Sequence, residues 1–483
     1  MKDWADSKRK RLSSRVRKLL PTTTSNSRHV EVVPRQTEPR VPTELVVEIL
    51  SHVHANLRKA VESQVYLRDK KDFYDEGFAL EERMKKAIGD SRRPLYNAAL
   101  VARTWRQICT PLLYAYPTIV TPRQLELFRK RITKYPELAR LVKAPSIMIA
   151  RGSQEFLPKE KRSAAYAVFS FMVARERQAF KETSLVLRAC PAFSTLSLQL
   201  PNEEIAQYYG WEFMGGGAST EGLLRLNIVR SSLLLTDDAT RSFTSLRVLS
   251  LNASFMDYLF RFPYLPNLHT LHILNSSVLM KHPDDPNVNY FPQPKFPSLR
   301  TVYLHQNSIL HRHIIDLIVP QELRELDLIG EDEVHAFGLL ATYSHDLGRS
   351  GLAPVEYLTI GDLGDIQHPL GKWKVSEVLK SLTIFVDLSS WSASLDVLTK
   401  FLEYNGDRIQ GRCTSLKTVV VNLNPGSRSY LVEDGVPLEQ RIKTSLCRVE
   451  SLCRNLGLTF RVVVVDVLEW ITQRGEDFSS NTQ

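Results

Sequence analysis

The residue types that do chemistry occur in this chain, but their spacing forms no catalytic motif. The sequence has no P-loop, no G-x-S-x-G, no H-E-x-x-H and no G-x-G-x-x-G. The run Gly215-Gly216-Gly217 is followed by alanine rather than lysine, which favours a flexible loop over a phosphate-binding turn. No local spacing of serine, histidine and aspartate selects a triad. We therefore predict that the chain is not an enzyme and uses no cofactor.

The potential metal ligands and thiols are also scattered. His311 and His313 flank one residue, but no third ligand follows at a suitable spacing, so the sequence predicts no metal site. The cysteines are odd in number and none forms C-x-x-C, which favours free or buried thiols in a reducing compartment. They are Cys109, Cys190, Cys413, Cys447 and Cys453.

Charge and hydropathy indicate where the chain works. No run of eighteen apolar residues and no apolar N-terminal leader is present, so we expect a cytoplasmic or nuclear protein without a membrane partner. Residues 1–40 hold eleven Lys or Arg and four Asp or Glu, a balance of +7 out of the net +10. The sequence predicts a disordered basic tail there. Its cluster Lys8–Arg11 fits a nuclear import signal, a weak phosphate-binding segment or a merely solvated tail. A faint amphipathic face in the same tail leaves a membrane-surface or transit segment as a further, minor alternative.

A repeating pattern governs the larger part of the chain. Nine segments place apolar residues at positions 1, 4 and 6, with starts 22 to 37 residues apart. They begin at Phe193, Leu223, Leu246, Leu268, Leu299, Leu323, Val355, Leu379 and Leu416, and Phe460–Val465 is a tenth candidate. One such short strand cannot bury its apolar side alone, so the units must stack into a parallel sheet. The pattern resembles an irregular leucine-rich-repeat array; the alternative is a conventional α/β domain of similar period.

Helices are predicted before, between and after these strands. Thr121-Pro122-Arg123-Gln124 is a helix start, with threonine as N-cap and proline in the first turn. Further helices are expected over 160–188, 311–318, 397–404 and 438–456, with Gly406 and Gly457 as stops. The segment 54–93 alternates charges over short distances and is predicted to be a mobile insert carrying helical turns.

Two helical segments near the N-terminus carry a second pattern. V-P-T-E-L-V-V-E-I-L-S-H-V at Val41–Val53 has a wide apolar stripe, and Leu95–Ala115 repeats apolar residues at helical spacing, with a stop predicted at Thr110-Pro111. Together they resemble an F-box, in the form common among fungal F-box proteins. The resemblance implies adaptor-binding residues Pro42, Leu45, Ile49, Leu50, Val101 and Trp105.

The two resemblances together imply a function. The chain is expected to be the substrate-recognition subunit of an SCF-type (Skp–cullin–F-box) ubiquitin ligase, with the Skp-type adaptor, the cullin and a target protein as partners. The alternative is an adaptor-independent leucine-rich-repeat scaffold. Nucleic-acid binding is a third and weaker hypothesis, because the body shows no basic stripe with interleaved aromatics.

The strand pattern also predicts a target-binding surface. Residues between the apolar positions of each strand point away from the core, and we expect them to face solvent. The predicted target-binding residues are Asn252, His272, Tyr303, His305, Asp327 and Phe385, and the alternative site is on the helical crossovers or on loops such as Lys281–Lys295. Others in the same rows are Gln199, Asn227, Ser250, Thr359 and Asn422.

The predicted fold class is α/β, with a small helical F-box-like domain followed by a leucine-rich-repeat solenoid built on a parallel sheet. The predicted domains are a tail at 1–40, the helical domain at 41–145 with its charged insert 54–93, the solenoid with a C-terminal cap at 146–470, and a flexible tail at 471–483.

Overall fold

A computed structural model describes a set of separate segments of the 483-residue chain. These are 44–53, 93–100, 103–119, 121–149, 178–179, 181–199, 222–229, 243–252, 255–256, 264–274, 277–278, 296–305, 322–329, 355–361, 375, 377–387, 391–411, 414–424 and 438–464. The predictions for the tail 1–40, the insert up to residue 92, Gly215–Gly217, the helix at 311–318 and the tail 471–483 lie outside them. The chain divides into two compact units, Met1–Val46 and Val47–Gln483, and the division falls within the helix at 44–53.

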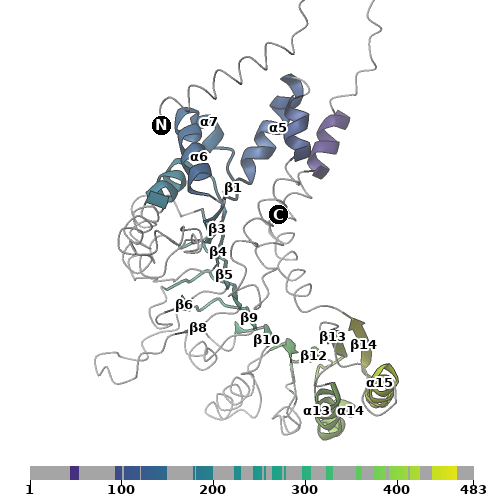
Figure 1. Cartoon of the computed structure of the whole chain (residues 1–483). Helices are drawn as coiled ribbons and strands as arrows, with labels where there is room; N and C mark the ends of the chain where they lie inside the picture. The colour runs from purple at the N-terminus through teal and green to yellow at the C-terminus, as the bar shows by residue number, and fades with distance from the viewer. Residues whose placement is uncertain are drawn as a thin grey trace, which may run out of the picture. The chain divides into compact units, whose positions relative to one another are not determined.

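The second unit is built on one sheet of twelve parallel strands, in which each strand pairs with the next along the sheet (Figure 1). The strands are β1 (Thr118–Ile119), β2 (Ser146–Met148), β3 (Thr195–Gln199), β4 (Arg225–Val229), β5 (Val248–Asn252), β7 (Thr270–Leu274), β9 (Thr301–His305), β10 (Glu325–Ile329), β11 (Tyr357–Ile360), β12 (Ser381–Asp387), β13 (Thr418–Asn424) and β14 (Thr459–Val464). β6 (Phe255–Met256) and β8 (Ser277–Val278) form a separate pair. The predicted α/β class with N-terminal helices and a solenoid-like parallel sheet is confirmed.

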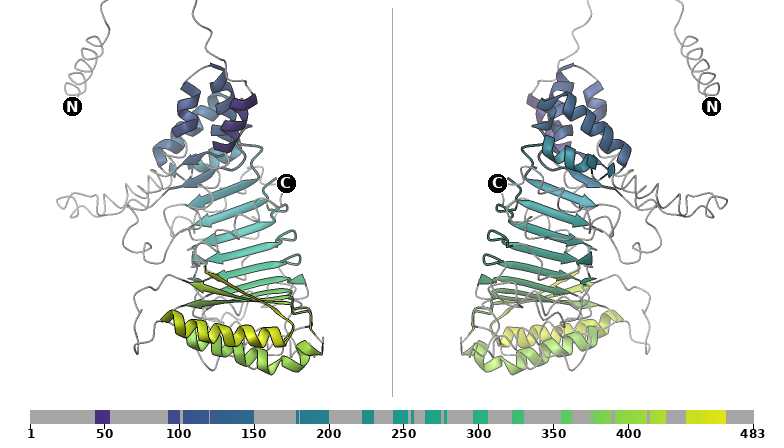
Figure 2. Two further views of the ribbon diagram at one scale, coloured as in Figure 1. Left: turned by 90° about the vertical axis from the view of Figure 1, so that its right-hand side faces the viewer. Right: turned by 90° about the vertical axis from the view of Figure 1, so that its left-hand side faces the viewer.

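All ten strands predicted from the repeats are present. Figure 2 shows the strands lying as successive rungs, which is the arrangement expected when each repeat buries its apolar side against its neighbours. In-register pairing forms two continuous apolar rows, one of which runs through Leu251, Ile273 and Leu304. These residues are buried in one core cluster that extends from Ile119 to Leu458. The apolar triplets of the sequence are therefore the core of the sheet.

The predicted helix over Leu95–Ala115 is seen as a helical stretch at 93–100 and α5 (Arg103–Ala115). The expected stop at Thr110-Pro111 is wrong, because α5 continues through Pro111 to Ala115. Proline inside a helix costs about 3 kcal/mol. Packing beyond the proline offsets this cost, since Ala115 is buried and Tyr114 stacks on Phe128 with ring centroids 6.1 Å apart.

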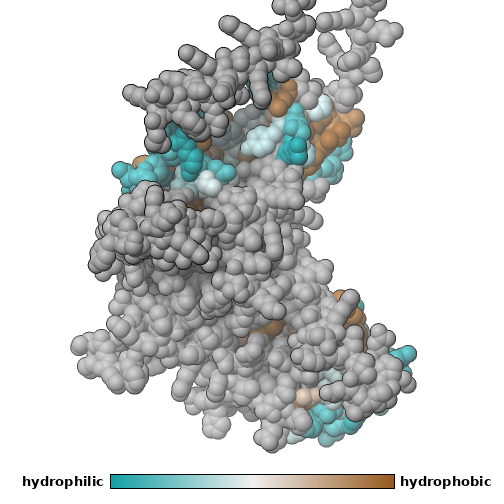
Figure 3. Space-filling view, in the orientation of Figure 1, coloured by the Kyte–Doolittle hydropathy of each residue, from teal (hydrophilic) through white to brown (hydrophobic). Residues whose placement is uncertain are grey.

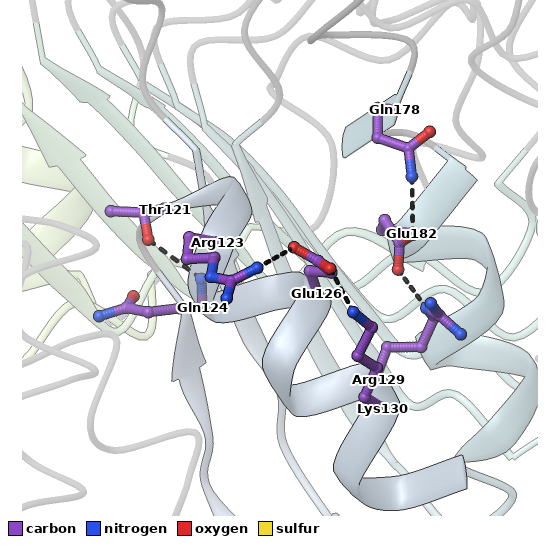
Figure 4. Close-up of polar contacts among 8 residues, drawn as sticks. All are labelled: Thr121, Arg123, Gln124, Glu126, Arg129, Lys130, Gln178 and Glu182. Carbon is purple, nitrogen blue, oxygen red and sulfur yellow. Dashed lines mark hydrogen bonds and ion pairs between the residues drawn. The ribbon is translucent and has the colours of Figure 1, made fainter. Parts of the chain in front are cut away.

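The predicted helix start at Thr121 is confirmed. α6 (Pro122–Lys134) has Thr121 as N-cap, whose hydroxyl accepts a hydrogen bond from the backbone N–H of Gln124 at 3.2 Å (Figure 4). The short helix α7 (Pro136–Ala139) follows, and helical residues at 178–179 and 181–189 precede β3. A buried carboxylate joins two of these helices, because Glu182 accepts hydrogen bonds from Arg129 of α6 and, at 2.7 Å, from Gln178. This pair holds α6 against the helix that leads into the sheet.

Helices close the last strands of the sheet. α13 (Trp391–Tyr404) packs on α15 (Leu438–Asn455), and α14 (Gly406–Gln410) lies between them in sequence (Figure 2). The helix expected to stop at Gly406 ends at Tyr404, and Gly406 itself is the first residue of the short helix α14. The stop at Gly457 is confirmed: its φ is 71°, and the next N–H, of Leu458, donates to the carbonyl of Cys453 at 2.8 Å. Within the part of the chain described, no helix is long and apolar enough to cross a bilayer.

The Arg129–Glu182 pair gives a prediction for stability. Glu182→Ala leaves the Arg129 guanidinium without its partner, and a side chain that loses a buried charged partner destabilises the fold by about 2–4 kcal/mol. We expect this loss in the free energy of unfolding measured by urea denaturation. The exposed pair Arg123–Glu126 is the control, since Arg123→Ala should leave the urea midpoint unchanged. Equal midpoints for Glu182→Ala and the wild type would contradict a structural role for the pair.

Candidate functional site

The helix at 44–53 carries two apolar pairs that differ in exposure. Val46 and Leu50 are each 3% exposed, whereas Leu45 is 47% and Ile49 is 51% exposed. Residues four apart lie on the same face of a helix, so each pair forms one face. One apolar face is buried, and the neighbouring apolar face meets solvent. Large exposed apolar side chains add nothing to the fold of the isolated chain, and they are typical of protein interfaces.

A second exposed apolar pair lies on the helix at 93–100. Tyr96 is 52% exposed and Leu100 is 75% exposed, while Leu95 and Ala98 on the same helix are buried. Figure 3 shows hydrophobic side chains in brown at the surface of the helical region that surrounds α5. Tyr96 and Leu100 are not among the residues predicted from the sequence, although their spacing of four and their position outside the predicted apolar stripe are visible there.

The other predicted adaptor-binding residues fall into different places. Leu50 is buried and supports the helix from inside rather than from its surface. Trp105 of α5 is half-buried, so its indole contributes both to packing and to the surface. Pro42 and Val101 lie outside the described residues. Of the predicted set, only Leu45 and Ile49 are strongly exposed among the residues whose side chains are described.

The predicted target-binding residues lie in two rows on the side of the sheet opposite the leucine core. His272 of β7, Tyr303 of β9 and Asp327 of β10 are adjacent in register, as predicted. The rings of His272 and Tyr303 meet edge to face with centroids 5.4 Å apart. Phe385 of β12 pairs with Asn422 of β13. The side chains of Asn252 and His305 are not among those described.

The expectation that these rows face solvent is wrong. Tyr303 is 1% exposed, Asp327 is fully buried, and His272 and Phe385 are buried too. Alternation along a strand decides on which side of the sheet a residue lies, but it does not decide whether that side is covered. Parallel sheets are usually covered on both faces, and this sheet follows that rule at the described positions. A role of these residues in target binding stays a prediction.

The row that contains His272, Tyr303 and Asp327 is polar and buried along ten consecutive strands of the sheet. Its members are Thr118, Ser146, Ser197, Asn227, Ser250, His272, Tyr303, Asp327, Thr359 and Thr383. Within it the amide nitrogen of Asn227 donates to the hydroxyl of Ser197 at 3.1 Å. A buried polar group is stable only where its hydrogen bonds are satisfied, so such a row favours one register of the strands over its neighbours.

Burial decides the ionisation of the titratable residues in this region. Burial, and then the positive charge of Arg225, lower the pKa of His272 to about 3, so the imidazole is neutral at pH 7. Burial likewise raises the pKa of the Cys190 thiol to about 12 and, with a smaller contribution from Glu450, that of Cys453 to about 11. These thiols stay protonated and unreactive. The described residues contain no cluster of three or more His, Cys, Asp and Glu able to hold a metal.

Comparison with known proteins adds no family to these observations. No protein-family model matches the sequence, and no curated protein matches it significantly.

The buried histidine makes stability depend on pH. In the unfolded chain His272 titrates near its ordinary pKa of 6.5, whereas in the folded chain its pKa is about 3. Below pH 6.5 the unfolded state therefore binds a proton that the folded state does not, and this contribution to stability falls by up to about 1.4 kcal/mol per pH unit. When the pH falls from 7 to 5, the wild type should lose about 2 kcal/mol more free energy of unfolding than His272→Gln.

The measurement is urea unfolding of both proteins at pH 7, 6 and 5. His52→Gln is the matched control, because His52 is exposed and its variant should keep the wild-type pH dependence. If wild type and His272→Gln lose the same free energy of unfolding between pH 7 and pH 5, the histidine is not held neutral by burial.

Proposed function

We propose that this chain is the substrate-recognition subunit of an SCF-type ubiquitin ligase. Its N-terminal helices would bind the Skp-type adaptor, and its repeat array, of the leucine-rich type, would hold a target protein. The chemistry of ubiquitin transfer then belongs to other subunits. The chain contributes proximity, which raises the effective concentration of a target lysine near the charged ubiquitin carrier.

The single observation that carries the proposal is the exposure of Leu45 and Ile49. Both belong to the P-T-E-L-V-V-E-I-L segment that resembles an F-box, and both lie in solvent while Val46 and Leu50 are buried. An amphipathic helix that only covers a core has no need of a second exposed apolar face. A helix that docks into the groove of an adaptor needs such anchors.

The repeat array supports the other half of the proposal. A sheet of twelve strands in sequential order offers a long row of equivalent positions, and solenoids of this kind bind proteins along such surfaces. The described residues form no metal cluster, and the sequence has no nucleotide-binding or hydrolase motif. Binding without catalysis is the activity that this arrangement favours.

The test is co-purification of the adaptor with the full-length chain. Leu45→Ala combined with Ile49→Ala should lower the amount of bound Skp-type adaptor by more than about tenfold, because each buried apolar anchor of an interface contributes roughly 1–4 kcal/mol. The melting temperature should stay close to that of the wild type, since both side chains are about half exposed and lie outside the buried core.

Two exposed leucines elsewhere provide the matched control. Leu127 of α6 and Leu185 of the helical stretch at 181–189 are also exposed, so Leu127→Ala combined with Leu185→Ala removes a similar apolar area. This control should keep the adaptor. Full adaptor binding by the Leu45/Ile49 variant, or no adaptor binding by the wild type, would reject the receptor and leave an adaptor-independent scaffold.

A further inference from the structure

The residues immediately before seven successive strands form one line along the sheet, here called the pre-strand line. They are Arg247, His269, Arg300, Arg324, Glu356, Lys380 and Lys417. The backbone N–H of each residue donates to the carbonyl of the residue that lies just before the preceding strand. These N···O distances are 2.8 to 3.0 Å for all seven residues. The side chains of the pre-strand line therefore repeat at the strand spacing of about 4.8 Å.

The pre-strand line is strongly biased in charge. It holds five Arg or Lys and one His against a single Glu, although the chain beyond residue 40 has a net charge of only +3. Exposure to solvent explains why these positions are polar, but it does not explain why nearly all of the charged side chains are positive. The line cannot be recognised from the sequence alone, because neighbouring members are 22 to 37 residues apart and only the parallel register brings them together.

One part of the pre-strand line is internally neutralised. Glu356 binds Arg324 at 2.7 Å and Lys380 at 2.5 Å, and the hydrogen bond from Lys380, followed by that from Arg324, lowers the pKa of the Glu356 carboxyl. This triad shows how a solenoid compensates cations at successive strand starts, because one carboxylate between two cations relieves their repulsion.

The other part lacks this compensation. Arg247 and Arg300 are exposed, and among the described residues no carboxylate forms an ion pair with either. They flank His269 closely: burial, and then the charges of Arg300 and Arg247, lower the pKa of its imidazole. Arg247 and Arg300 precede strands that lie two spacings apart, roughly 10 Å, and no described carboxylate neutralises either guanidinium group.

We propose that Arg247, His269 and Arg300 form a binding site for an extended segment of a partner protein rich in Asp and Glu. Guanidinium groups bind carboxylates through paired hydrogen bonds, and an extended segment presents its side chains along a line. That the segment belongs to a protein selected for ubiquitin transfer rests on the proposed function. The inference that an acidic segment binds here does not depend on the proposed function.

The neighbouring residues favour a protein segment over a nucleic acid. The residues that follow on the strands are Val248, Thr270 and Thr301, which offer no aromatic face. Single-stranded nucleic acids gain much of their affinity from bases stacked on aromatic rings, and the positions directly before and after these three residues supply none: they are Leu246, Leu268 and Leu299, and Val248, Thr270 and Thr301.

The experiment measures peptide binding to the full-length chain in the absence of the adaptor. The probe is a fluorescein-labelled peptide of about twelve residues that alternates Glu and Ser, so that its carboxylates share one side when extended. Fluorescence anisotropy at low salt should show saturable binding that weakens steeply as salt is added. Arg247→Glu combined with Arg300→Glu should weaken binding by about tenfold or more, whereas Arg247→Lys with Arg300→Lys should retain most of it.

The matched control changes the same charge elsewhere. Arg188 and Lys443 are exposed on other helices, and Arg188→Glu combined with Lys443→Glu should bind the peptide within about twofold of the wild type. Equal loss in both double variants would reduce the effect to net charge and overturn the site. Tighter binding of a labelled thymidine oligonucleotide than of the peptide, sensitive to the Arg247/Arg300 reversal, would overturn the choice of a protein segment. Because adaptor co-purification is measured separately, its failure leaves this test unchanged.

Discussion

In-register parallel pairing of consecutive strands is the constraint on which the rest of this structure depends. From β3 onward, each repeat contributes a strand of four to seven residues to the sheet, with apolar side chains on one side. Such a strand has no stable existence alone, because its backbone groups and its apolar side both need a neighbour. Backbone hydrogen bonds along the pre-strand line and the continuous leucine rows meet these needs together.

The same register determines where the remaining chemistry lies. Residues at matching positions of successive strands fall into rows, so residues that are 22 or 31 apart in sequence become neighbours. One row is the buried polar series that contains His272 and Tyr303, and the pre-strand line is another. A slip of one residue in any strand would move its leucines out of the core and break both rows. Fold and surface chemistry are therefore specified by one pattern.

The sequence predicted the ten repeat strands because their apolar spacing recurs many times. It missed β1 and β2, which have two and three residues and are too short to show a period. The sequence predicts a helix end at Pro111, but the packing of Tyr114 and Ala115 holds the helix beyond it. Local preferences predicted these segments correctly only where tertiary contacts did not oppose them.

The candidate sites were harder to predict, since they depend on what covers each surface. Alternation placed His272, Tyr303 and Asp327 in one row, yet all three are buried rather than exposed. The apolar stripe of the helix at 44–53 included both Leu45 and Leu50, and only the structure separates the exposed residue from the buried one. Charge at the strand starts became visible as a line only once the register was known.

Hydrogen exchange of the folded chain tests the continuous sheet most directly. Ile273 of β7 is fully buried, and Ile273→Val removes one methylene at a cost of about 1 kcal/mol. If consecutive strands form one hydrogen-bonded unit, this change should accelerate amide exchange in β5 and β9 as well as in β7, as expected when neighbouring repeats open together. Faster exchange confined to β7, with β5 and β9 unchanged, would contradict the continuous sheet.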